Sequence, residues 1–200
     1  MFQFDAALIP RVQTKPTDSF SLDPGTVICG KNGKFCIQKK LGRCTYKVKQ
    51  NGTENMFFLR IESLASVVDL PSLKTDVFVL ESMAKLSDKC KKHFLQLIDK
   101  GRSPGKCNFL VTNMADINLE DLRSKRLKKD FKPTTALALS MHTLHGIHDV
   151  HTCGYIHRNI SPSNFLIGLG KDNCTVFITG FSFGYKYHSP QKSEGAKKSR

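Results

Sequence analysis

The stretch VHTCGYIHRNISPSNFLIG, residues 150–168, decides how this chain is interpreted. It begins within the end of a helix that we predict over residues 133–152, with Pro133 in the first turn, where its missing N–H group is not needed. The apolar side chains of this helix recur at helical spacing at Leu137, Met141, Leu144 and Ile147. Short strands are expected after it, over residues 165–167 and 175–179. The stretch therefore connects a long helix to a small hairpin.

The first half of the chain is predicted to be mainly β-strand. Apolar and alternating runs indicate strands over residues 35–41, 45–50, 56–62, 93–99 and 107–113. Asn51 and Gly52 both tolerate a positive φ, so they predict a hairpin turn. One helix is expected over residues 72–86, and a short one over residues 119–127 with Asn118 as its cap. Strands with one helix, followed mostly by helix, predict an α+β protein in two lobes.

The quoted stretch resembles the catalytic loop of protein kinases, H-R-D-x-K-x-x-N, and especially the H-R-D-I-K-P-S-N-F form of the casein kinase I group and its tau-tubulin kinase branch. The matching residues are His157, Arg158, Ile160, Pro162, Ser163, Asn164 and Phe165. Further kinase-like segments follow in the family's order: FFLRIES at 57–63, KTDVFVLESM at 74–83, NLEDLR at 118–123 and ITGFSFGYKY at 178–187. The resemblance covers residues 36–187 and implies a two-lobed kinase fold.

The resemblance also assigns catalytic positions, and several carry altered residues. Asn159 stands at the position of the catalytic base, where the family has Asp, and an amide is not a useful base near neutral pH. Ser161 replaces a Lys that neutralises the transferred phosphate. Of the two metal-binding positions, Asn164 is present, but Gly180 replaces an Asp and has no ligand atom. A shifted register would put Ser182 there, which is no carboxylate either.

The nucleotide-binding positions implied by the resemblance are also altered. Only Gly42 remains of the glycine-rich loop, whose backbone N–H groups approach phosphates. Arg60 stands at the position of the phosphate-anchoring Lys, and Asp76 stands at the position of its Glu partner. An ion pair between Arg60 and Asp76 would either anchor phosphate or only align the helix, and we favour the second role. Thr112 falls at the gatekeeper position and Met114 in the hinge. An adenine pocket and a packed hydrophobic seam fit this pattern equally.

Composition limits the function classes. The chain has 200 residues, with 31 Lys plus Arg against 17 Asp plus Glu, a formal net charge of +14. Such a charge favours acidic partners or simply gives a well-solvated surface. We expect no membrane span and no secretory signal. Seven cysteines without a C-x-x-C pair are typical of free thiols, so we expect an intracellular, cytoplasmic protein.

Two local patterns were weighed for other roles. Histidines recur every three residues at His142, His145, His148 and His151. At 100° per residue the first and last point to opposite helix faces, so they are not expected to share one metal ion. Basic residues cluster at Lys89, Lys91, Lys92, Arg123, Lys125, Arg126, Lys128 and Lys129. We favour the interpretation that these clusters form a solvated face. A surface that binds acidic or phosphorylated proteins is the second interpretation, and a surface that binds nucleic acid is the third.

We divide the chain into a flexible arm at 1–33, a truncated kinase-like domain at 34–188 and a basic tail at 189–200. The sequence leads us to expect a pseudokinase of the casein kinase I group that acts as a non-catalytic protein-binding module. The alternatives are a weakly active ATP-dependent Ser/Thr kinase and a basic nucleic-acid-binding protein. No cofactor is expected, and ATP with Mg²⁺ would bind only if a residual nucleotide site survives.

Overall fold

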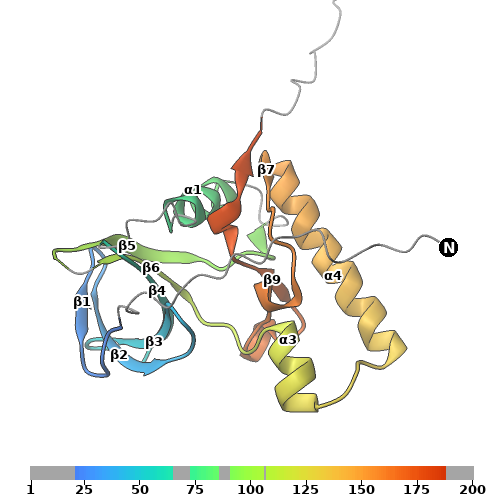
Figure 1. Cartoon of the computed structure of the whole chain (residues 1–200), viewed down its shortest axis with the longest axis horizontal. Coiled ribbons are helices and arrows are strands. Elements are labelled where there is room, and N and C mark those ends of the chain that lie inside the picture. The colour runs from blue at the N-terminus through green and yellow to red at the C-terminus, as the bar shows by residue number, and fades with distance from the viewer. Residues whose placement is uncertain (1–20, 65–72, 86–90, 106, 188–200) are drawn as a thin grey trace, which may run out of the picture.

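A six-stranded antiparallel sheet forms the first half of the structure (Figure 1). The computed structural model describes residues 21–64, 73–85, 91–105 and 107–187. The sheet has the strand order β1-β2-β3-β4-β6-β5. Its strands are β1 (Val27–Cys29), β2 (Lys34–Lys40), β3 (Thr45–Gln50), β4 (Met56–Ser63), β5 (Leu97–Ser103) and β6 (Cys107–Asn113). The predicted hairpin turn joins β3 to β4, and Gly52 has a φ of 78° there.

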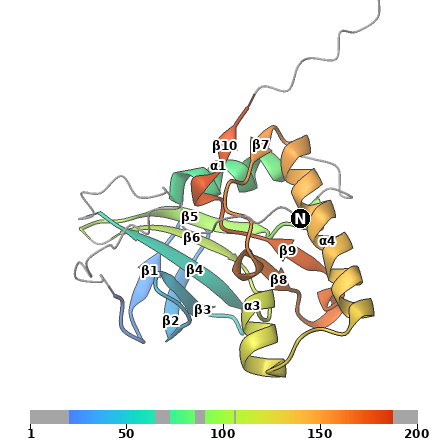
Figure 2. The same ribbon diagram turned by 45° about the vertical axis from the view of Figure 1, so that its right-hand side comes forward.

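The second half is mostly helical and carries two small two-stranded antiparallel sheets (Figure 2). Its helices are α3 (Leu119–Asp121), which continues as a π-helical segment (Leu122–Leu127), and α4 (Pro133–Thr152). Its strands are β7 (Tyr155–Ile156), β8 (Phe165–Ile167), β9 (Val176–Ile178) and β10 (Tyr185–Lys186), paired as β8–β9 and β7–β10. Between sheet and helices lies α1 (Leu73–Met83), as Figure 1 shows. The predicted α+β, two-lobed, kinase-like architecture is therefore confirmed.

Each half has its own hydrophobic core. Alternate residues of the curled sheet form the first core, with Phe35, Tyr46 and Leu59 fully buried. The second core joins α1, α4 and β9 through side chains such as Val79, Val150 and Ile178, all at 0% exposure. Alternation along the strands and helical spacing along α1 thus each supply one buried face, whereas α4 buries only Gly146, Asp149 and Val150.

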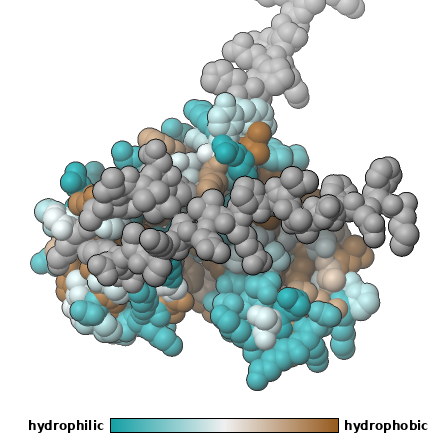
Figure 3. Space-filling model, viewed as in Figure 1, coloured by the Kyte–Doolittle hydropathy of each residue, from teal (hydrophilic) through white to brown (hydrophobic). Residues whose placement is uncertain are grey.

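Helix α4 is held to the rest of the molecule at its C-terminal half. Gly146 is buried and faces Ile178, where a Cβ on residue 146 would lie at an ordinary contact distance of 3.5 Å. The buried His93 ring, at Nδ1, bonds Asp149 Oδ2 at 2.7 Å. Other apolar side chains of α4 are exposed: Leu137 at 66%, Met141 at 54% and Leu144 at 64%. Figure 3 shows hydrophobic colour on the side of the molecule where α4 lies.

The structure corrects the extent of the predicted N-terminal arm. Residues 21–33, which we assigned to a flexible arm over 1–33, contribute strand β1 and the buried Leu22 and Ile28. The three-residue strand was missed because it is shorter than the runs that show a period. Residues 1–20 and the predicted tail 189–200 lie outside the described residues.

Two further predictions of elements were wrong in part. The strand predicted over 93–99 begins only at Leu97, because His93 and Phe94 pair with Ile178 of β9 instead of with the sheet. The helix predicted over 119–127 is capped by Asn118 as expected, with Asp121 N donating to Asn118 Oδ1 at 2.7 Å. However, it is α-helical only to Asp121 and π-helical from there on.

Within the described part of the chain, no helix combines the length and the apolar character that crossing a bilayer requires.

Alanine substitutions on the buried and the exposed face of α4 should have different effects on the free energy of unfolding. Val150→Ala should lower the free energy of unfolding by about 2 kcal/mol, because a fully buried side chain loses two methyl groups and leaves a cavity. Leu144→Ala should change it by less than about 0.5 kcal/mol, because Leu144 is already exposed. Urea unfolding of both variants measures the difference. Equal losses would contradict this assignment of the helix faces.

Candidate functional site

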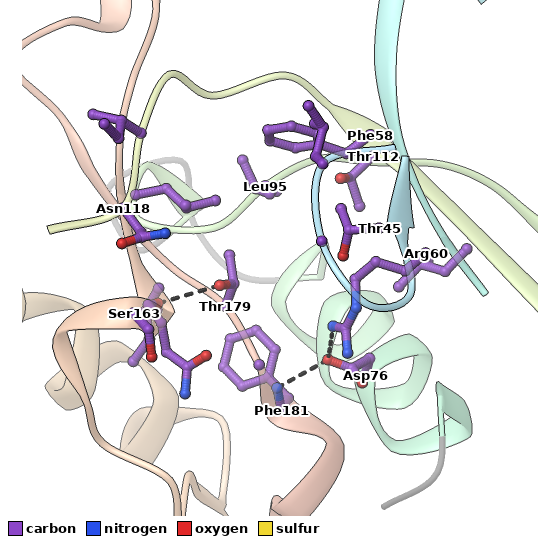
Figure 4. A pocket seen from close by; sticks show the side chains of 18 of the residues that line it. Thr45, Phe58, Arg60, Asp76, Leu95, Thr112, Asn118, Ser163, Thr179 and Phe181 are labelled. Atoms are coloured by element: carbon purple, nitrogen blue, oxygen red, sulfur yellow. Dashed lines mark hydrogen bonds and ion pairs between the residues drawn. The ribbon is translucent and has the colours of Figure 1, made fainter. Parts of the chain in front are cut away.

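A cavity of about 460 Å³ lies between the sheet and the helical half (Figure 4). Side chains from the sheet reach it from Thr45, Phe58, Arg60 and Thr112, and Asp76 and Leu80 reach it from α1. The other side is formed mainly by residues 116–121, by the turn before β8 and by the segment after β9. Its volume lies within the range of small-molecule sites. It is the candidate site of this chain.

The Asp76 carboxylate is the centre of a hydrogen-bond network at one end of the cavity. Asp76 is 1% exposed and accepts a hydrogen bond from Arg60 Nη1 at 2.8 Å. It also accepts one from the Phe181 backbone N–H at 2.9 Å and one from the Ser182 hydroxyl. Arg60 Nη2 in turn donates to Ser182 Oγ at 3.1 Å. The predicted Arg60–Asp76 pair therefore forms (Figure 4), and Ser182 bonds both partners.

The two other carboxylates that line the cavity are also paired with basic side chains. Asp116 accepts from Arg126 at 2.9 Å, and Asp121 forms an ion pair with Lys125 at 2.8 Å. The hydrogen bond from Arg126 lowers the pKa of Asp116, and that from Lys125 lowers the pKa of Asp121. Both carboxylates are therefore fully ionised near neutral pH, and each already has a cationic partner.

The loop that carries the kinase-like stretch is held by backbone hydrogen bonds. His157 is 1% exposed, and its Nε2 lies 2.8 Å from Thr179 O. Its Nδ1 accepts from the Asn159 backbone N–H at 3.2 Å, which assigns the proton to Nε2. Burial lowers the pKa of His157, against smaller opposing effects of Thr179 and Asp76. A neutral imidazole therefore holds the loop against the segment after β9.

Gly180 and Asn164 meet directly where the resemblance places the metal. Gly180 has a φ of 80°, and a Cβ atom on residue 180 would lie 2.4 Å from Asn164 Oδ1. The Asn164 amide also donates from Nδ2 to Asn159 O at 2.8 Å. The side chain of Asn164 thus fills the space into which a side chain at position 180 would project.

The structure brings together some residues assigned by the resemblance and separates others. Gly42, Arg60, Asp76, Thr112, Asn164 and Gly180 line the cavity. Asn159, Ser161 and Met114 do not line it. Asn159 is exposed, and the Ser161 hydroxyl bonds that of Ser163 at 2.7 Å.

Sequence reasoning missed Phe58 and gave Ser182 no bonding role. The period of two along β4 could have found Phe58, because it places residues 58 and 60 on one face. Only the folded backbone, which brings the turn after β9 against α1, reveals the contact of Ser182 with Asp76.

Metal-binding side chains do not gather elsewhere. Among the residues that the structure describes, no group of three or more His, Cys, Asp or Glu is arranged to hold a metal ion. His145 lies against His93, with ring centroids 6.1 Å apart, whereas His148 and His151 are exposed. Cys29, Cys36, Cys44 and Cys174 are free thiols.

Comparisons with known proteins bear on the family. The Caenorhabditis elegans protein named "Putative serine/threonine-protein kinase ZK507.3" is 30% identical over 182 residues, which is 90% of this chain and 46% of that protein. "Putative serine/threonine-protein kinase ZK507.1" of the same organism is 37% identical over 118 residues, 59% of this chain and 35% of that protein. The chain is related to the serine/threonine protein kinases. No protein-family model matches it.

The kinase-like chain spans less than half the length of these curated relatives. A third relative, "Serine/threonine-protein kinase spe-6" of Caenorhabditis elegans, is 32% identical over 117 residues, 58% of this chain and 29% of that protein. The similarity to ZK507.3 extends over nine-tenths of the chain, so both lobes of the kinase-like fold belong to the related region.

The Asp76 network should contribute strongly to the stability of the kinase-like fold. Asp76→Ala should lower the free energy of unfolding by about 3–5 kcal/mol, because it leaves a buried N–H donor and a partly buried guanidinium without their acceptor. Glu81→Ala is the matched control on α1, since its ion pair with Lys100 is exposed. We expect less than about 1 kcal/mol for the control. Chemical denaturation measures both variants. Equally small losses in the free energy of unfolding would contradict the role assigned to Asp76.

The buried neutral His157 predicts a loss of stability in mild acid. The pKa of His157 is lower in the folded chain than in the unfolded chain, where the pKa of histidine is about 6.5. Below that pH the unfolded state binds more protons, so the free energy of unfolding falls as pH decreases. His142 acts in the same direction, because burial lowers its pKa too. The slope is at most about 1.4 kcal/mol per pH unit for each histidine.

Thermal unfolding between pH 7.5 and pH 5 measures this dependence. The His157→Gln variant should start less stable at pH 7.5 and lose less on acidification than the wild type. An unchanged pH dependence in this variant would rule out the role of His157.

Proposed function

We propose that this chain is a catalytically inactive, kinase-like protein-binding module of the casein kinase I group. The observation that carries the proposal is the pairing of all three carboxylates that line the cavity. Asp76, Asp116 and Asp121 are bonded to Arg60, Arg126 and Lys125. Phosphoryl transfer depends on Mg²⁺ to neutralise charge, and Mg²⁺ prefers carboxylate ligands. The cavity offers none that lacks a cationic partner.

The residues at the implied metal position support the same proposal. Gly180 supplies no ligand atom, and the Asn164 side chain occupies the adjacent space. Asn164 Nδ2 is held by Asn159 O, so the amide is tied to the loop. One neutral amide is a poor site for a hard divalent cation. The residues present therefore do not fit Mg²⁺, and we derive no catalytic step through it.

The group that would accept a proton from a substrate hydroxyl is also replaced. Asn159 carries an amide at this position, and loss of a general base typically costs about 10²–10⁴-fold in rate. Ser161 removes a cation that would stabilise the transferred phosphate. Arg60 keeps its charge, but its guanidinium is bonded to Asp76 and Ser182. The interpretation of the Arg60–Asp76 pair as an alignment of α1 is thereby favoured.

The assignment to the casein kinase I group and its tau-tubulin kinase branch rests on the I-S-P-S-N-F run at residues 160–165. An acidic or phosphorylated protein partner is part of the proposal. Lys39 and Lys47 lie directly opposite each other on β2 and β3, where like charges repel, so an anionic partner would relieve that repulsion.

The basic cluster at residues 123–129 offers fewer unpaired charges for binding an anionic partner. Three of its side chains, Arg123, Lys125 and Arg126, pair with acidic residues of the chain. Lys89, which belongs to the other predicted basic cluster, lies outside the described residues.

Phosphoryl transfer is the direct test. The purified chain with radiolabelled ATP, Mg²⁺ and a casein-type acceptor should incorporate no label above a blank without protein. ATP with Mg²⁺ should also raise the free energy of unfolding by no more than about 0.4 kcal/mol. A ligand stabilises the folded state little when its dissociation constant exceeds its concentration. The measurements are label incorporation and the melting temperature with and without Mg²⁺.

The rival function, a weakly active Ser/Thr kinase, makes the opposite prediction. It requires label incorporation that Asn164→Ala abolishes, and a melting shift of several degrees that depends on Mg²⁺. Label incorporation that survives Asn164→Ala would point to a contaminating kinase and not to this cavity. Transfer abolished by that substitution would refute the proposed function.

A further inference from the structure

The side chain of Phe58 is directed into the cavity by its place on β4. Successive residues of a strand point to opposite faces of the sheet. Phe57, Leu59 and Ile61 face the buried core of the sheet, where the Phe57 ring meets Phe35 edge-on at 6.0 Å. Phe58 and Arg60 therefore share the other face, and both line the cavity. The sequence FFLR thus places an aromatic ring and a cation on the same face of β4, and both line the candidate site.

Phe58 packs across the cavity onto the helical half of the molecule. Its ring lies against a cluster of three buried side chains, Leu95, Ala115 and Phe177. Leu166 of β8 is partly buried and packs against the same cluster from the opposite lobe. Strand β4 and the β8–β9 hairpin are thus joined by apolar side chains within the site. Of the two alternatives left open by the sequence, an adenine pocket and a hydrophobic seam, these contacts favour a seam at this end.

The two ends of the cavity differ in chemistry. In Figure 4, Phe58 lies beside Thr112 at one end, and Arg60 and Asp76 lie at the other. The polar end is closed by hydrogen bonds among Arg60, Asp76 and Ser182. At the apolar end the aromatic ring of Phe58 forms part of the wall, together with Leu95 and Leu166. Removing a phenyl ring from an apolar site leaves a space of matching shape, and an apolar cavity of about 150 Å³ binds benzene.

We propose that Phe58 is an internal plug that excludes planar heteroaromatic ligands, such as purine nucleosides, from the apolar end of the cavity. The ring lines the cavity and packs, like Leu166, against Leu95, Ala115 and Phe177, so it lies where a flat ligand entering this end would have to pack. Phe58 therefore determines which ligands the site admits, independently of whether phosphate is transferred there. This inference goes beyond the proposed function, which concerns the metal and the catalytic groups.

Binding of adenosine to the full chain tests the plug. Adenosine carries no phosphate and needs no metal, so the result is separate from the test of phosphoryl transfer. Isothermal titration should show at least about tenfold tighter binding to Phe58→Ala than to the wild type, which corresponds to about 1.4 kcal/mol. Phe57→Ala is the matched control, because it removes the same ring from the neighbouring residue on the opposite face of β4. The control should bind adenosine no more tightly than the wild type.

Several outcomes would overturn the proposal. One is a wild type that binds adenosine as tightly as Phe58→Ala; another is an equal gain in Phe57→Ala, which would indicate a general loosening of the sheet. Far-ultraviolet circular dichroism and a cooperative melt establish that each variant is folded. If Phe58→Ala does not fold, Phe58→Val is measured in the same way, since it keeps an apolar contact but removes the ring. A folded variant of either kind without tighter adenosine binding refutes the plug.

Discussion

One buried carboxylate joins three segments that lie far apart in the sequence. Asp76 on α1 receives hydrogen bonds from Arg60 on β4, and from Phe181 and Ser182 after β9. A charge with 1% exposure is stable only when it is paired and fully hydrogen-bonded, so these contacts are needed together. The position of α1 between the lobes, the direction of Arg60 and the course of the chain after Gly180 all depend on this carboxylate.

A second set of contacts holds the lobes together through the same cavity. Phe58 and Leu166 pack onto one apolar cluster, while His157 connects the kinase-like loop to Thr179. The two lobes are therefore held by contacts within the space between them, polar at one end and apolar at the other.

The sequence predicted much of this fold because its signals are local. The period of helix α4, the Asn51-Gly52 turn and the Asn118 cap each act within a few residues, and each was confirmed. The kinase-like loop and the Arg60–Asp76 pair could be expected from motif order. The start of β5 could not, because it depends on the pairing of His93 and Phe94 with Ile178, about 85 residues away. The contacts of Phe58 and Ser182 likewise depend on how the lobes meet.

The contact between Gly180 and Asn164 constrains the order in which substitutions can accumulate. A carboxylate introduced at position 180 would meet the Asn164 amide, which is itself bonded to the loop. It would also need a left-handed backbone, which costs a non-glycine residue about 1–2 kcal/mol. Asn164 would have to move first, and that movement breaks a hydrogen bond without any gain until the second change arrives. The effects of substitutions at the two positions on stability are therefore coupled, and a carboxylate at position 180 requires a change at Asn164 as well.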